Sequence, residues 1–163
     1  PVTRPLVHEY TLQRDGTEVE VRWRVGDAGN PFPASVPELL ERAGRVVIGG
    51  RTVPALAPED RFLVLAYHGT KHRWHLLKWV VDVAAVTTAA NPAWDEVLAR
   101  ARAGGLERRV LLASALARDV FDVEVPPPIR QALAGGDIGA LAESAAGYLR
   151  DGPRARRRRG QES

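Results

Sequence analysis

Strict alternation of apolar and polar positions predicts β-structure near the start of the chain. Residues 17–25, TEVEVRWRV, alternate at every position, which is typical of a strand with one buried face. Residues 6–13, LVHEYTLQ, form a second candidate strand, and Asp15-Gly16 between the two favours a tight hairpin turn. We expect one face of this hairpin to lie in a core. That face holds Val19, Val21, Trp23 and Val25.

Beyond the hairpin the spacing of apolar residues becomes mostly helical. A short helix is expected at 37–43 and a short strand at 45–48, which Gly49-Gly50 ends. Pro54 prevents the following segment, RTVPAL at 51–56, from being a central strand. From Pro58 onward apolar residues recur every three or four positions. The expected helices run from 58 to about 67, then after a break or kink at Gly69-Thr70 to about 88, and at 93–103, 106–121, 129–133 and 138–149.

These elements predict an α+β fold. Residues 1–53 form a small β-rich part, and residues 54–150 form a helical domain of five or six helices. Residues 151–163 have no apolar periodicity and are expected to be a disordered, Arg-rich tail.

The stretch YHGTKHRWHLLKWVVD, residues 67–82, gathers unusual side chains. If residues 65–86 formed one continuous helix, six of them would share a sector of about 100° on its surface. They are His68, Lys71, His72, His75, Trp79 and Asp82. Histidine, fixed cations and an indole on one face suit an anionic ligand such as phosphate.

Two other interpretations of this stretch remain open. It is also compatible with a solvated helix face that carries an ion pair between Lys78 and Asp82. Imidazoles spaced like those of His68 and His72 can chelate zinc. Zinc is the weaker alternative because there is no HExxH motif, and Lys71 and Arg73 would place positive charge beside a cation.

Charge and composition narrow the class of protein. The net charge of +3 comes from the tail, whose five arginines, with two acids, leave 18 basic and 18 acidic residues in the rest of the chain. A basic run can attract nucleic acid, although five charges are a weak footprint. The arginines are Arg154, Arg156, Arg157, Arg158 and Arg159.

Other features of the composition bear on location and completeness. No stretch approaches 18 consecutive apolar residues, no signal peptide is evident, and cysteine is absent, which together favour a cytoplasmic protein without a membrane partner. The chain starts at Pro1 and contains no methionine, which indicates a fragment or a processed product.

Two motifs resemble those of a known family. VEVRWRV at 19–25, followed by VPALAPEDRFLVLAYHGTKHRWHLLKWVVDVAAV at 53–86, resembles the C-terminal half of a largely uncharacterised group of bacterial nucleotidyltransferase-fold proteins. The resemblance covers residues 7–134, and the longer motif is the more specific.

The resemblance implies transfer of a nucleoside monophosphate from an NTP to an unknown acceptor. In this superfamily three carboxylates hold two Mg²⁺ ions. The third carboxylate corresponds to Glu20, the candidate metal ligand and catalytic residue here. The resemblance implies that Lys71, Arg73 and Lys78 contact the triphosphate, and that His68 or His72 orients phosphate or acceptor. Asp82 is a partner of Lys78 or a base, and both Trp74 and Trp79 are expected to fill core.

The resemblance also shows which family motifs are not found in residues 1–163. In the family a glycine loop and an Asp-x-Asp pair precede the hairpin, whereas Glu18-Val19-Glu20 is the one acid-x-acid pattern on a predicted strand here. One carboxylate cannot hold two Mg²⁺ ions. We therefore expect no transfer by these residues alone, with the remainder supplied by a missing N-terminal half or a partner chain. The alternative is a non-catalytic module that binds a nucleotide or another protein.

Overall fold

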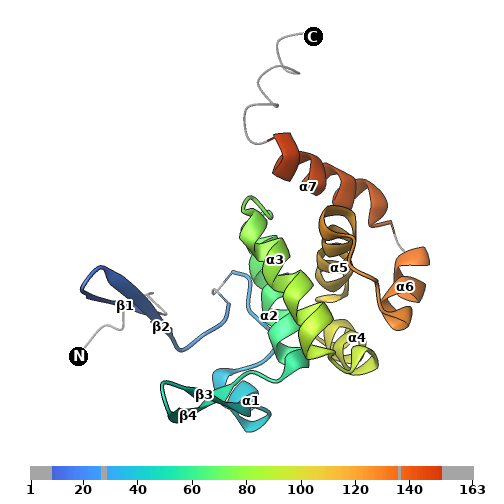
Figure 1. Cartoon of the computed structure of the whole chain (residues 1–163). Helices are drawn as coiled ribbons and strands as arrows, with labels where there is room; N and C mark the ends of the chain where they lie inside the picture. Colours follow the sequence, from blue (N-terminus) through green and yellow to red (C-terminus); the bar gives the residue numbers. More distant parts are fainter. Residues whose placement is uncertain (1–8, 27–28, 136, 152–163) are drawn as a thin grey trace. The chain divides into compact units, whose positions relative to one another are not determined.

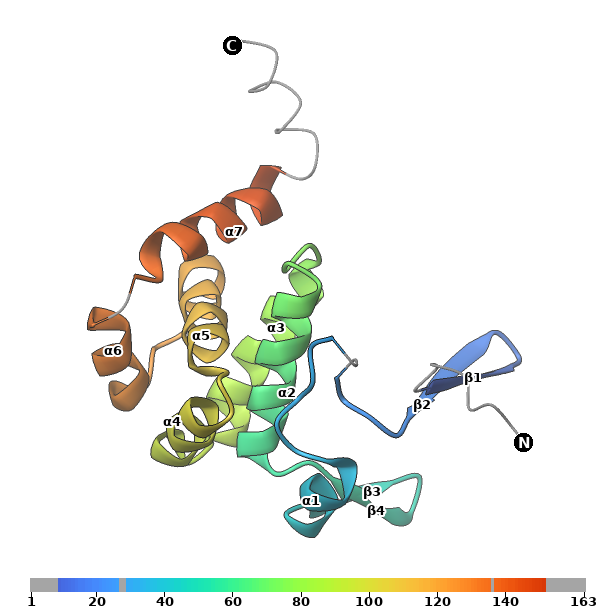
Figure 2. The same ribbon diagram turned by 180° about the vertical axis from the view of Figure 1, so that it is seen from behind.

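A computed structural model describes residues 9–26, 29–135 and 137–151. The chain divides into two compact units, one up to Leu56 and the other from Ala57 onward. Figures 1 and 2 show the elements from two opposite sides. The five tail arginines lie outside the described residues, so a nucleic-acid role for them stays a prediction.

The first unit begins with the predicted hairpin. Strand β1 (Glu9–Arg14) pairs antiparallel with β2 (Thr17–Arg22), with Leu12 opposite Val19. Asp15 and Gly16 have φ angles of 50° and 76°, the left-handed pair that a two-residue turn requires. This confirms the turn predicted from the sequence.

The apolar face of this hairpin is not a core, and that prediction is wrong. Val19, Val21 and Trp23 are 51%, 47% and 44% exposed. The sheet has two strands, which are too few to cover a face of their own. Tyr10 shares this face, and its ring centroid lies 5.1 Å from that of Trp23.

A short helix and a second hairpin complete the first unit. Helix α1 (Val36–Glu41) starts with a capping box, in which the Ser35 hydroxyl and backbone N–H donate to the Glu38 carboxylate at 2.6 and 2.7 Å. The hydrogen bond from the Ser35 hydroxyl lowers the pKa of Glu38 most, and the hydrogen bond from the Ser35 backbone N–H lowers it further. Strands β3 (Gly44–Ile48) and β4 (Arg51–Ala55) form the hairpin, which tolerates a proline because both of its strands are edges.

The second unit is helical, which confirms the α+β class. Six α-helices are described in it, with one π-helical turn, η1 (Val86–Ala90), after the second of them. The helices are α2 (Pro58–Lys71), α3 (Leu77–Ala85), α4 (Trp94–Ala103), α5 (Glu107–Phe121), α6 (Pro127–Ala134) and α7 (Gly139–Asp151).

Helix α5 organises the core of this unit. It contacts α2, α3, α4, α6 and α7, and Figures 1 and 2 show it between the α2–α3 pair and α6. Its middle part, from Val110 to Ala117, is buried on all sides of the helix. Fully buried apolar side chains from the neighbouring helices pack around it: Phe62, Ala66, Val80, Val83, Val97 and Ile129. None of the described helices is long and apolar enough to cross a membrane.

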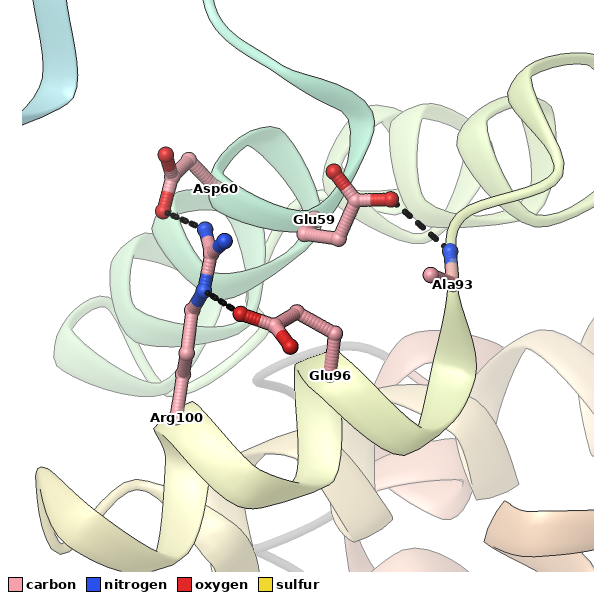
Figure 3. A network of polar contacts seen from close by, with 5 residues as sticks. All are labelled: Glu59, Asp60, Ala93, Glu96 and Arg100. Atoms are coloured by element: carbon pink, nitrogen blue, oxygen red, sulfur yellow. Dashed lines mark hydrogen bonds and ion pairs between the residues drawn. The ribbon is translucent and has the colours of Figure 1, made fainter. Parts of the chain in front are cut away.

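A polar network fixes the start of α2 against α4 (Figure 3). Asp60 is 1% exposed, and its Oδ1 accepts a hydrogen bond from Arg100 Nη1 at 2.9 Å. The same guanidinium donates through Nε to the exposed Glu96 at 2.8 Å. Glu59 accepts from the backbone N–H of Ala93 at 2.8 Å, which caps the N-terminus of α4.

Burial should make the two carboxylates that contact Arg100 differ in their effect on stability. We expect Asp60→Asn to lower the free energy of unfolding by about 1.5–3 kcal/mol, because a buried bond between charged groups loses one of its charges. Glu96→Gln should lower the free energy of unfolding by less than about 0.5 kcal/mol, since the ion pair of Glu96 with Arg100 is solvated and lies within one helix. Denaturant unfolding of both variants measures the difference, and equal losses would contradict a buried role for Asp60.

Candidate functional site

The motif at 67–82 folds as two helices joined by a sharp turn, not as one helix. Helix α2 ends at Lys71 and α3 begins at Leu77. Arg73 and Trp74 have φ angles of 55° and 54°, in the left-handed region that side chains rarely adopt. The break predicted at Gly69-Thr70 is therefore misplaced, because both residues lie within α2.

The turn is held by the ring of Trp74, which folds back onto α2. Trp74 is 2% exposed, and its backbone N–H donates to the carbonyl of Gly69 at 2.8 Å. A Cβ built on Gly69 would lie 2.4 Å from two carbons of the indole, which is closer than atoms can approach. Glycine is therefore required at 69 by the ring that packs on it, and burial of the indole compensates for the strained backbone at 73–74.

Three imidazoles gather around a second, buried indole. Trp79, 7% exposed, lies at the start of α3. Its ring centroid is 5.4 Å from that of His68, 5.2 Å from that of His72 and 4.6 Å from that of His75. The rings of His68 and His72 are 4.5 Å apart. Of the six residues expected on one face of a continuous helix, the turn thus brings the three histidines and Trp79 together, and both tryptophans fill core as predicted.

The proton positions on His75 follow from its hydrogen bond. Its Nδ1 lies 2.7 Å from the backbone carbonyl oxygen of His72. A carbonyl oxygen can only accept, so Nδ1 carries the hydrogen. In the neutral ring Nε2 is then an acceptor, and in the protonated ring it is a second donor that can bind an anion.

A pocket of about 590 Å³ opens beside this turn. The turn and the end of α2 form one wall, and α5 and α7 form the other. The first wall holds Thr70, His72, Arg73, Trp74 and His75, and the second holds Leu112, Leu141, Ser144, Ala145 and Tyr148. None of these ten residues is acidic. In the part of the chain that the structure describes, no carboxylate forms an ion pair with Arg73.

Three other predicted site residues of this segment do not line the pocket. Lys71 is half-buried at the end of α2, and both Lys78 and Asp82 are exposed on α3. Among the described residues, no ion pair joins Lys78 to Asp82, although their spacing predicts one. The assigned roles of these three residues stay predictions.

Glu20, the candidate metal ligand, belongs to the first unit. Its carboxylate accepts from Arg22 Nη2 at 2.8 Å, and Glu18, two residues away on the same strand, accepts from Gln13 at 3.2 Å. Carboxylate oxygens suit Mg²⁺. Within residues 9–26, 29–135 and 137–151, however, no group of three or more His, Cys, Asp or Glu side chains is placed to hold a metal ion. The described residues thus do not complete a magnesium site.

The α7 wall of the pocket was not predicted from the sequence. Leu141, Ser144, Ala145 and Tyr148 recur at helical spacing, a signal that indicates one face of a helix but not whether that face meets core or ligand. The contact of α7 with α5 places this face opposite the turn.

Comparison with protein families agrees with the motifs. A family model described as an uncharacterised nucleotidyltransferase matches residues 3–122. The chain therefore belongs to this nucleotidyltransferase family, and its general kind of function is that of a transferase acting on nucleotides. Comparisons with curated proteins and with solved structures gave no significant match. Helix α7 lies beyond the matched residues.

The contact between Gly69 and Trp74 predicts opposite effects for two glycine substitutions. Gly69→Ala should lower the free energy of unfolding by about 1–3 kcal/mol, because the added methyl overpacks a buried site. Gly147→Ala in α7 meets open space and should raise it by up to about 1 kcal/mol, through helix propensity.

Denaturant unfolding gives both values, and Gly147→Ala is the matched control because it makes the same change within a helix. A neutral Gly69→Ala would show that the indole does not pack on the glycine.

Proposed function

We propose that the turn between α2 and α3 forms the phosphate-binding wall of a nucleotide site in this transferase. Lys71, His72 and Lys78 face the triphosphate of an NTP, whereas Arg73 lines the adjacent pocket. His68 helps to orient the phosphate or the acceptor. The observation that supports this most is the convergence of imidazoles at one turn that is flanked by Lys71 and Lys78.

The start of α3 supports an anion at this position. Its N-cap is Leu76, which offers no side-chain acceptor to the first backbone N–H groups of the helix. Exposed N–H groups at a helix N-terminus attract negative charge. Lys78 lies in the first turn of the same helix, so a phosphate there would meet both backbone donors and a cation.

We also propose that residues 1–163 bind a nucleotide without transferring it. Glu20 is the catalytic carboxylate contributed by this chain, and further carboxylates would have to complete the two-ion arrangement of the superfamily. Asp82, exposed on α3, is proposed as a base or as a partner of Lys78 once ligand is bound.

Nucleotide binding can be followed at the turn itself. Titration with ATP and Mg²⁺ should shift the NMR signals of the imidazoles of His68, His72 and His75 and of the Trp79 indole. Lys78→Gln should weaken binding about fivefold, as expected for one partly solvated ion contact worth roughly 1 kcal/mol.

The matched control for Lys78→Gln is Arg108→Gln, which removes an exposed cation from α5, away from the turn. Equal weakening by both variants would indicate general charge attraction, and a titration that leaves the 68–82 signals unmoved would exclude a nucleotide site at the turn.

A second candidate is a non-catalytic interaction module. The exposed apolar face of the β1–β2 hairpin favours it, since Tyr10, Leu12, Val19 and Val21 are between 47% and 64% exposed. A two-stranded sheet with such a face can add strands or pack against another chain. We propose a further polypeptide as its partner, in the simplest case a second copy of this chain.

Self-association through this face should depend on its apolar side chains. Size-exclusion chromatography with light scattering should show a dimer whose population falls at least about tenfold in Val21→Lys, because a charge cannot be buried there without a partner. Gln13→Lys places the same charge on the polar face of the hairpin and should leave the dimer intact. A monomer at every concentration would contradict self-association.

A further inference from the structure

The pocket beside the turn has two unlike walls, and only one belongs to the family motif. His72, Arg73 and His75 line it from the turn. Ser144 and Tyr148 line it from α7, which lies outside the residues matched by the family model. The family motif therefore accounts for the basic wall, and a helix beyond the matched residues supplies most of the other.

The charge of the lining indicates the sign of a ligand. Arg73 is a fixed cation at the pocket edge, His72 lines the pocket beside it, and the protonated ring of His75 can donate to an oxyanion through Nε2. No acidic residue lines the pocket, so nothing there would pair with a cationic ligand. An anionic group is favoured at the turn.

The shape and polarity of the remainder indicate the body of a ligand. Trp74, Leu112 and Leu141 provide apolar surface, while the hydroxyls of Ser144 and Tyr148 provide isolated polar contacts. A volume of about 590 Å³ is in the range of pockets that enclose small organic molecules. Such a lining suits an apolar or aromatic body with one charged end.

The same features argue against the triphosphate as occupant. A triphosphate carries several negative charges, and the lining contains one fixed cation, Arg73, while Lys71 and Lys78 lie outside it. Multiple phosphates need several cations or a metal to offset their desolvation.

We propose that this pocket binds a small organic oxyanion, a carboxylate or a monophosphate with an apolar body, and that this molecule is the acceptor side of the reaction. The binding site stands on the pocket geometry, whereas the acceptor role rests on the nucleotide transfer proposed above. Residues of α7 then select the acceptor, and the turn contacts acceptor and nucleotide from its two sides.

Binding can be measured on the unmodified chain with defined probes. We would titrate it with 3-phenylpropionate, with phenyl phosphate and with the uncharged 3-phenylpropionamide, and record the four tryptophan indole signals by NMR. The Trp74 signal should shift with an anionic probe. The Trp94 signal should stay in place, because that ring packs against Phe62 away from the pocket. The stronger of the two anionic probes identifies carboxylate or phosphate as the preferred group.

Two variants with matched controls test the walls separately. Ala145→Trp fills the pocket from α7 and should abolish probe binding, whereas Ala140→Trp makes the same change at an exposed α7 position outside the lining. Arg73→Gln should weaken binding at least about tenfold, as expected when a charged hydrogen-bond donor is lost, and Arg108→Gln should not. Circular dichroism of each variant confirms that it is folded.

The outcomes separate this inference from the proposed function. Probe binding that Ala145→Trp abolishes while ATP binding persists supports both. Probe binding without any ATP binding supports the pocket and removes the proposed nucleotide site. Loss of ATP and probe binding together in Ala145→Trp, or equal binding of the amide and the carboxylate, would overturn the proposal of a separate oxyanion site.

Discussion

The indole of Trp74 packs on the bare Cα of Gly69, and the candidate site depends on this contact. Burying the ring turns the chain back on α2 within five residues and holds Arg73 and Trp74 in left-handed backbone conformations. Without this turn, α2 and α3 could form one continuous helix, with the histidines in a row along one face. With it, three imidazoles converge on Trp79, and the basic side of the turn faces a pocket.

The turn therefore has two sides with different chemistry. One side is an aromatic and imidazole cluster that includes His68, and the other is the pocket edge with Arg73. His72 and His75 belong to both sides, so a ligand bound on either side of the turn would lie near the same two imidazoles. This arrangement suits a transferase, in which donor and acceptor must meet at a shared boundary. The ion pair of the buried Asp60 with the half-buried Arg100 anchors α2 against α4 at the opposite end of α2.

Much of the local structure could be predicted because it depends on local rules. The turn at Asp15-Gly16, the helix start at Pro58 and the helix end at Gly104-Gly105 each follow from backbone conformations that few residues favour. The apolar face of the hairpin shows the limit of such rules. Alternation correctly places Val19 and Val21 on one face, but whether a face is covered depends on what packs against it, and in this structure it is exposed.

The sequence by itself determined the first hairpin, the order of the helices, the α+β class, the family and the set of unusual side chains at 68–82. Only the tertiary structure decided where the helix breaks, which histidines meet and that α7 forms half of a pocket. Propensity predicts the break at Gly69-Thr70, whereas the structure keeps both residues helical and bends the chain at Arg73 and Trp74. Propensity reports the preference of one residue, but the position of this turn is set by the fit of an indole against a glycine five residues earlier. The α7 wall needed the packing of a helix across a long sequence separation, which periodicity does not encode.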